Sequence, residues 1–211
     1  MKEQLGMDKV QPRFEFRTFG QNFDWAVKRM ARLSMPVPEN LWDRHSDEIY
    51  IVSRAITHNN TKIRDGLLDI KTLIETKQGL EKWNPLLKVV FPISVDALRD
   101  EIFPALQADM PTFDQNNIHM AAFLEMVQGH PKLVAVRIHK QRSAYLVNNA
   151  ICETGSVLIN GARVETICIE STEMDDILKA INEIGLAGIE NINYLQAIKR
   201  VIGMIDKPLA N

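Results

Sequence analysis

Charged side chains that could bind anions or metal ions recur on segments of this chain that have the alternating pattern of β-strands. They are Glu15, Arg17, Lys62, Arg64, Lys71, Arg137, His139, Lys140, Arg142, Glu153 and Glu170. Basic groups that converge on one space repel one another unless an anion lies among them, and phosphate oxygens match the forked geometry of arginine. Carboxylates among these bases would hold a hard cation such as Mg²⁺ or Mn²⁺. The residue types therefore indicate phosphate chemistry, although no single catalytic residue can be named.

The segment 61–71 shows how such charges are positioned. Its Asp65-Gly66 pair, flanked by alternating residues, predicts a hairpin with a two-residue type I′ turn. In that register one face carries Ile63, Leu68 and Ile70, and the other carries Lys62, Arg64, Asp69 and Lys71. On an isolated hairpin the charged face would simply be solvated. Because similar strands occur before and after it in the chain, a shared charged space is the alternative.

The other elements are expected in an order of strands, helices, strands and helices. Arg13 to Phe19 alternates strictly, with Arg13, Glu15 and Arg17 on one face. We expect one domain over residues 1–211, strand-rich at 13–93, helical at 94–130, strand-rich at 132–170 and helical again at 172–203. The other strands are expected at 48–53, 83–93, 133–138, 145–153, 156–159 and 164–170, with a turn at Asn160-Gly161. The predicted helix N-caps are Asn22 or Asp24, Ser94, Asp114, Thr172 and Asn193. The helix that Ser94 caps is expected over 95–107, where Pro104 should kink or shorten it.

Two antiparallel arrangements satisfy this alternation. An open sheet would bury its apolar face and leave its charged face in water. A closed barrel would instead carry helices on its apolar outside and charged residues in its lumen. The alternation of the strands does not by itself separate the two.

Composition limits the classes of function. The chain has 211 residues, 45% of them hydrophobic, and a net charge of −2, so any anion site must be local and no general attraction to nucleic acid or membrane is expected. Cys152 and Cys168 form neither a disulfide framework nor a zinc-binding spacing. Residues 1–10 have no apolar core of a signal peptide, and no run is long enough to span a bilayer. A cytoplasmic protein is expected.

The ordered set of motifs resembles the CYTH superfamily, the triphosphate tunnel metalloenzymes, which include class IV adenylyl cyclases, thiamine triphosphatases and inorganic triphosphatases. The resemblance covers roughly residues 13–202. It depends on a first strand similar to Glu-x-Glu-x-Lys, on Lys62-x-Arg64, on Leu68-Asp69-Ile70-Lys71, on Lys140-x-Arg142 with Tyr145, and on a late strand that ends at Glu170. It implies an α+β fold in which an eight-stranded antiparallel barrel, the tunnel, has flanking helices.

The resemblance also implies residue roles. The phosphate-binding residues would be Arg17, Lys62, Arg64, Lys71, Arg137, Lys140 and Arg142. The metal ligands would be Glu15, Glu153 and Glu170, holding Mg²⁺ or Mn²⁺. Arg137 and His139 alternate out of phase with Lys140 and Arg142 unless a β-bulge intervenes.

The chain departs from the family pattern at its acids. Arg13 stands where the family has the first Glu of its opening strand, and Cys168 stands where it has the first Glu of Glu-x-Glu. In the strand where the family has Arg-x-Glu-x-Glu, this chain matches only at Glu81. The phosphate-binding residues are therefore better retained than the metal ligands, which marks a divergent member.

Three hypotheses of function follow. The first is a metal-dependent phosphohydrolase for a triphosphate or polyphosphate, in which Arg64, Lys71 and Arg142 stabilise the transferred group, or a cyclase that uses the same site. The second is a metal-poor module that binds phosphate-rich anions without catalysis. The third is an α+β protein whose charged faces are merely solvated. The sequence determines neither the organic group of the ligand nor the oligomeric state, for which a homodimer is one alternative.

Overall fold

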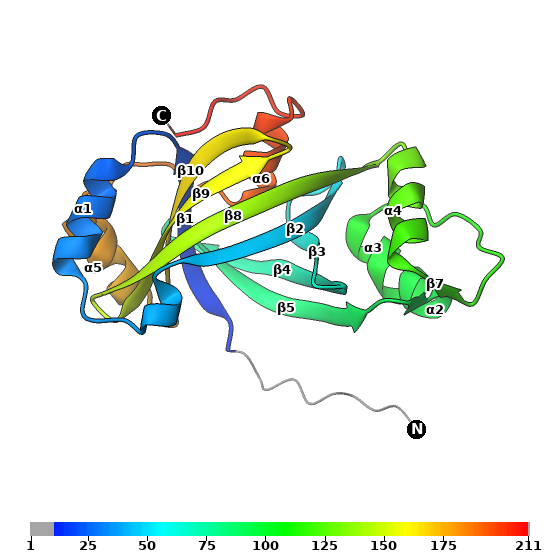
Figure 1. Cartoon of the computed structure of the whole chain (residues 1–211), viewed down its shortest axis with the longest axis horizontal. Coiled ribbons are helices and arrows are strands. Elements are labelled where there is room, and N and C mark those ends of the chain that lie inside the picture. Colours follow the sequence, from blue (N-terminus) through cyan, green and yellow to red (C-terminus); the bar gives the residue numbers. More distant parts are fainter. Residues whose placement is uncertain (1–10, 211) are drawn as a thin grey trace.

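The computed structural model describes residues 11–210 and shows a closed antiparallel barrel. Its strands are β1 (Arg13–Gly20), β2 (Arg44–Ser53), β3 (Asn59–Arg64), β4 (Leu67–Lys77), β5 (Leu80–Val90), β8 (Leu133–Val147), β9 (Ala150–Ile159) and β10 (Ala162–Ser171). They follow one another around the barrel as β1-β10-β9-β8-β2-β3-β4-β5, and β5 pairs with β1 to close it (Figure 1). The expected α+β fold with an eight-stranded barrel is confirmed. The expectation about residues 1–10 lies outside the described residues.

Two-residue turns join many neighbouring strands. Both turns expected from the sequence are confirmed, and at Asp65-Gly66 both residues have the positive φ, 52° and 72°, that a type I′ turn needs. The turns Gln78-Gly79 and Asn148-Asn149 also have positive φ and were missed. The predicted strand 145–153 is therefore wrong as one element, because its two asparagines adopt the left-handed conformation and reverse the chain between β8 and β9.

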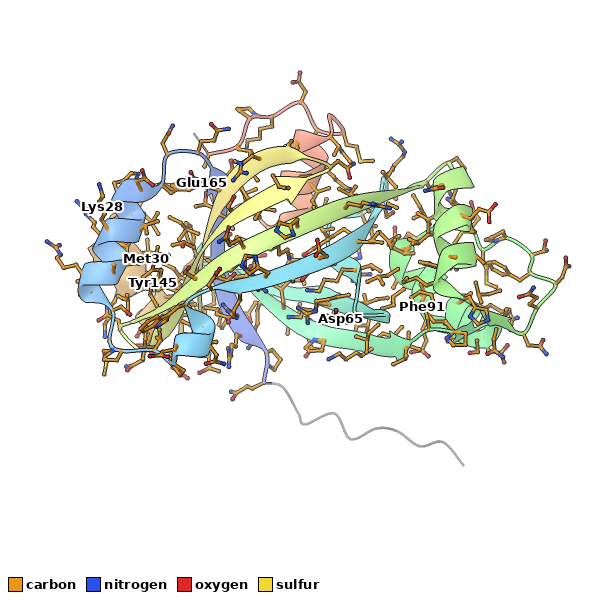
Figure 2. All side chains as sticks on the ribbon, in the orientation of Figure 1. Lys28, Met30, Asp65, Phe91, Tyr145 and Glu165 are labelled. Carbon is orange, nitrogen blue, oxygen red and sulfur yellow. The ribbon has the colours of Figure 1, made fainter. Side chains whose placement is uncertain are left out.

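Two groups of helices cover the outside of the barrel. Helices α1 (Asp24–Leu33) and α5 (Met174–Ile184) pack against the apolar outer side chains of β1, β9 and β10. The second group is α2 (Val95–Ala97), the π-helical turn η2 (Leu98–Ile102), α3 (Phe103–Leu106) and α4 (Met120–Gly129), and it covers β2, β3, β4 and β8 at the opposite end (Figure 1). In Figure 2, Met30 lies between α1 and the strands, whereas Lys28 points away.

The helix starts expected from the sequence are partly confirmed. Ser94 Oγ accepts the backbone N–H of Ala97, as predicted. Asp114 is not a cap, because β7 (Asn117–Ile118) pairs with β6 (Ile93–Ser94) and delays the helix to Met120. The predicted helix 95–107 is interrupted by η2, just before Pro104, whose ring cannot sit inside a regular helix. Thr172 is not a cap either, since helix α5 begins two residues later.

Helix α6 (Tyr194–Val201) fills one end of the barrel lumen. It begins at a capping box in which Asn193 and Gln196 each satisfy the other's backbone N–H, as expected of Asn193. Its Tyr194, Leu195 and Ile198 join an apolar cluster with inward-facing side chains such as Phe19 and Tyr50. Apolar packing thus occupies this end of the lumen, and the charged residues lie beyond it. No helix in the described part of the chain is long and apolar enough to cross a membrane.

Candidate anion-binding site in the barrel lumen

The charged part of the lumen is a cavity of about 270 Å³. Among the described residues that line it, the basic ones are Arg17, Arg44, Lys62, Arg64, Lys71, Lys140 and Arg142, and the acidic ones are Glu15, Glu48, Asp69, Glu153 and Glu170. Six of the seven predicted phosphate-binding residues and all three predicted metal ligands are therefore brought together. Seven bases against five acids leave an excess of positive charge inside a protein whose net charge is −2.

Strand alternation places these side chains inward. In the hairpin β3-β4, Lys62 pairs with Asp69 and both line the cavity, while Ile63 and Leu68 pair on the outer face beneath the α2–α4 helices. The hairpin interpretation is confirmed in register and in face. Because each apolar outer face is covered by helices, the charged faces have only the lumen to occupy.

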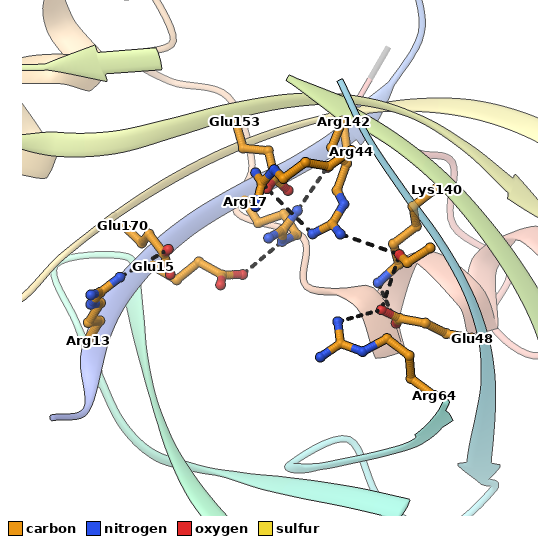
Figure 3. Close-up of polar contacts among 12 residues, drawn as sticks. Arg13, Glu15, Arg17, Arg44, Glu48, Arg64, Lys140, Arg142, Glu153 and Glu170 are labelled. Carbon is orange, nitrogen blue, oxygen red and sulfur yellow. Dashed lines mark hydrogen bonds and ion pairs between the residues drawn. The ribbon is translucent and has the colours of Figure 1, made fainter. Parts of the chain in front are cut away.

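The carboxylate of Glu48 is the centre of the deepest charge network. Its Oε2 accepts a hydrogen bond from Lys140 Nζ at 2.7 Å and lies 3.5 Å from Lys62 Nζ, and its Oε1 lies 3.4 Å from Arg64 Nη1 (Figure 3 shows Lys140, Arg64 and Glu48). Only 1% of the Glu48 side chain is exposed. Three cations from two strands, β3 and β8, therefore share one buried carboxylate of β2.

Burial and charge act in opposite directions on this network. Burial would raise the pKa of the Glu48 carboxyl, but Lys140, Lys62 and Arg64 outweigh it and lower the pKa to about 2. Burial, together with the nearby Lys62, lowers the pKa of Lys140, and Glu48 opposes that shift. Glu48 is thus a carboxylate at neutral pH, and the ammonium of Lys140 depends on it.

Tyr194, the first residue of α6, supports the two deepest basic residues. Lys140 Nζ lies 3.8 Å from the centroid of its ring, and the guanidinium carbon of Arg17 lies 4.8 Å from it. The ring also stacks on Tyr50 at 5.5 Å. Cations over an aromatic face are stabilised by its quadrupole, so α6 contributes to the charged cavity as well as filling the lumen behind it.

Near the middle of the cavity, Arg44 and Arg142 face one another across Glu153. Arg44 Nη2 donates to Glu153 Oε2 at 2.6 Å, and Arg142 Nη1 lies 3.5 Å from the same oxygen. The Nε atoms of both arginines are buried and have no hydrogen-bond partner among the described residues. Buried donors without partners are rare in proteins, and here both belong to residues that line the cavity.

The predicted metal ligands do not form a metal-binding group as the described residues are arranged. Glu15 and Glu170 are paired across β1 and β10, but Arg17 Nε donates to Glu15 at 2.8 Å and Arg13 Nη1 lies 3.3 Å from Glu170. No group of three histidine, cysteine or acidic side chains that could hold a metal ion is found in residues 11–210. The donor set therefore does not fit Mg²⁺ or Mn²⁺, and we assign no metal-dependent step to it.

In contrast to Glu48, the acids Glu170 and Glu81 have a pKa that burial raises. Desolvation, followed by the charge of Glu15, raises the pKa of the Glu170 carboxyl. Desolvation also raises the pKa of Glu81, although Asn193 Nδ2 at 2.9 Å and Trp83 Nε1 at 3.2 Å donate to its carboxylate. Glu81, which matched the family pattern, thus anchors the start of α6.

Arg137 lies outside this cavity, although it was a predicted phosphate-binding residue. Its side chain is exposed on the outer face of β8, and its backbone N–H donates to Asn160. The ladder between β8 and β2 runs through Arg137 and Lys140 without a register shift, and the ladder between β8 and β9 is also regular from Ile138 onward. With no bulge, Arg137 and His139 must point away from the face that Lys140 and Arg142 share.

Several lining residues were missed from the sequence. Glu48 and Tyr50 alternate within a predicted strand, and that alternation was the available signal. Arg44 precedes the strand expected at 48–53, but β2 already begins there. Tyr194 and Asn193 lie on a distant helix, and no local pattern connects them with the strands.

Comparison with known proteins finds matches among solved structures alone, at low sequence identity. No protein-family model and no curated protein matches the chain. It is similar to a solved Hippeastrum structure, described as an adenylyl cyclase candidate with a dominant triphosphatase activity, at 11% identity over 92% of this chain and 97% of that one, with a TM-score of 0.49. An adenylate cyclase candidate from Bacillus halodurans is 9% identical over 89% of this chain and 98% of that one, with a TM-score of 0.49. A conserved hypothetical protein from Pyrococcus furiosus is 16% identical over 87% of this chain and 98% of that one, with a TM-score of 0.48. No residue role is carried over from them.

Proposed function

We propose that this protein binds the triphosphate or polyphosphate group of a small molecule in the lumen of its barrel. The observation that carries the proposal is the convergence of seven basic and five acidic side chains on one cavity, counted among the described residues. An excess of buried positive charge destabilises the folded protein unless an anion compensates it. A phosphate chain supplies several negative charges and many acceptor oxygens within a narrow, linear shape.

The unpartnered donors support the same ligand class. The buried Nε atoms of Arg44 and Arg142 have no acceptor among the described residues, and both guanidinium groups are only partly used by Glu153. Phosphate oxygens accept from guanidinium groups in pairs. We therefore expect Arg44 and Arg142 to contact the ligand, together with Lys62, Arg64 and Lys71 nearer the hairpin.

A small molecule is favoured over nucleic acid because these bases face the lumen. Nucleic-acid binding needs basic groups on a surface that a strand or groove can reach. The cavity of about 270 Å³ suits a short chain of phosphate groups. Hydrolysis of the bound ligand, or its cyclisation, is an alternative raised by the family resemblance, and no described residue is placed for such a step.

The direct test is binding of sodium tripolyphosphate, measured by isothermal titration calorimetry and by thermal unfolding. We expect one site per chain and a raised melting temperature, because a ligand that binds only the native state stabilises it by about 2.7 kcal/mol at one hundred times its Kd. Equal responses to sulfate and tripolyphosphate would contradict a site for a phosphate chain. Release of phosphate or pyrophosphate from tripolyphosphate, ATP or thiamine triphosphate with Mg²⁺ or Mn²⁺ would add catalysis.

A further inference from the structure

Each of the three lumen acids predicted as metal ligands is paired with an arginine of the same chain. Arg17 Nε lies 2.8 Å from Glu15, Arg44 Nη2 lies 2.6 Å from Glu153, and Arg13 Nη1 lies 3.3 Å from Glu170 (Figure 3). These three pairs come from β1, the start of β2, β9 and β10, so they are distributed around the wall of the barrel. In each pair the guanidinium already uses a carboxylate oxygen.

A hard divalent cation would compete for those same oxygens. Mg²⁺ and Mn²⁺ bind through carboxylate and phosphate oxygens and require several of them at once. To reach Glu15 and Glu170, which pair across neighbouring strands, a cation would have to displace Arg17 and Arg13 and then lie beside their positive charges. Cys168, the residue opposite Arg17, supplies a buried thiol, and a thiol is a poor ligand for a hard cation.

We propose that Arg13, Arg17 and Arg44 act as built-in counter-cations in place of a divalent metal, so that the lumen binds a polyphosphate chain without metal and prefers the free anion to its Mg²⁺ complex. This inference rests on the proposed function. It assigns the neutralising role to guanidinium groups that the protein carries permanently.

The preference for the free anion follows from the charges. Mg²⁺ removes two negative charges from a phosphate chain and covers some of its oxygens. The seven basic side chains of the lumen would then face a ligand with fewer acceptor oxygens. Glu15, Glu153 and Glu170 could not hold the cation, because each of them is already paired with an arginine. Free ligand therefore satisfies more of the buried donors.

The first experiment is titration of the full chain with tripolyphosphate in EDTA and again with Mg²⁺ in excess over the ligand. We expect tight binding in EDTA and about tenfold weaker binding with Mg²⁺, a change of about 1.4 kcal/mol. Binding that is tighter with Mg²⁺ than in EDTA would overturn the inference while leaving the proposed function intact. Absence of binding in both conditions would instead refute the proposed function.

The second experiment does not depend on a phosphate ligand. Mn²⁺ alone is titrated into the wild type, Arg13→Glu and Arg137→Glu, and bound Mn²⁺ is measured by electron paramagnetic resonance. Arg13 is about half exposed and Arg137 is exposed on the outer face, so both variants should fold and both change the charge equally.

We expect Mn²⁺ binding only in Arg13→Glu, where loss of the guanidinium frees Glu170 and adds a carboxylate beside Glu15 and Glu170. Stoichiometric Mn²⁺ binding by the wild type at micromolar concentration would overturn the inference. Absence of Mn²⁺ binding in Arg13→Glu, or equal binding in Arg137→Glu, would overturn the role assigned to Arg13.

Discussion

The ammonium group of Lys140 lies 2.7 Å from a carboxylate oxygen of Glu48, and the two side chains are only 3% and 1% exposed. Lys140 comes from β8 and Glu48 from β2, so the pair fixes the contact between two strands that are about ninety residues apart in the chain. A buried ion pair of this kind costs desolvation energy, and removal of one partner leaves the other charge uncompensated. The pair therefore allows direct tests of the lumen's electrostatics.

Replacement of Lys140 by Met should destabilise the protein by about 2–4 kcal/mol, somewhat less than for an isolated buried pair because Lys62 and Arg64 still face Glu48. The free energy of unfolding in urea measures the effect. Arg137→Met, which removes an exposed cation from the same strand, is the matched control and should change stability by less than about 0.5 kcal/mol. Equal effects of the two changes would show that Lys140 is not held in a buried pair.

Acid should remove the contribution of Glu48. Its pKa is about 2 in the folded protein against an ordinary value of 4.5, so its stabilisation is complete above about pH 5 and is lost as the pH falls toward 2. The difference corresponds to at most about 3 kcal/mol. Urea unfolding of the wild type and Glu48→Gln between pH 7 and pH 2.5 measures it. The wild type should lose more stability than the variant over that range, and parallel curves would refute the lowered pKa.

The two faces of β8 provide a test of the ligand site. Arg142→Met should weaken tripolyphosphate binding about tenfold or more, since a hydrogen bond to a charged group contributes about 1.5–3 kcal/mol. Arg137→Met should leave the affinity within about twofold, because its side chain lies outside the cavity. Calorimetric titration in EDTA compares the two variants. A similar loss in both would mean that general surface charge, and not the lumen, binds the anion.

Tyr194 should act through its ring and not through its hydroxyl. The hydroxyl is buried without a partner among the described residues, whereas the ring contacts Lys140 and Arg17. Tyr194→Phe should keep stability and tripolyphosphate affinity, and Tyr194→Leu should lose about 1–3 kcal/mol of stability along with several-fold in affinity. Thermal unfolding and titration measure both. A Phe variant as damaged as the Leu variant would assign the role to the hydroxyl.

The sequence by itself determined the local structure of the barrel wall. Alternation placed Lys62, Arg64 and Lys71 on one common face, because successive side chains of a strand point to opposite sides. It also set Arg137 out of phase with Lys140, but both were predicted to bind phosphate, and only the absence of a bulge in β8 showed that Arg137 lies outside the cavity. Asp65-Gly66 determined the register of its hairpin, since few other residue pairs adopt positive φ at both positions. The helix break near Pro104 and the cap at Asn193 were equally local.

Only the tertiary structure decided whether the charged faces enclose a space or meet solvent. That depends on closure between β5 and β1, a contact between segments about seventy residues apart that no local pattern specifies. The same long-range packing brought Tyr194 beneath Lys140 and Arg17, and it paired Arg13, Arg17 and Arg44 with the acids expected to bind metal. Residue type predicts which charges a strand carries, but the partner that neutralises each charge depends on how the strands are arranged around the barrel.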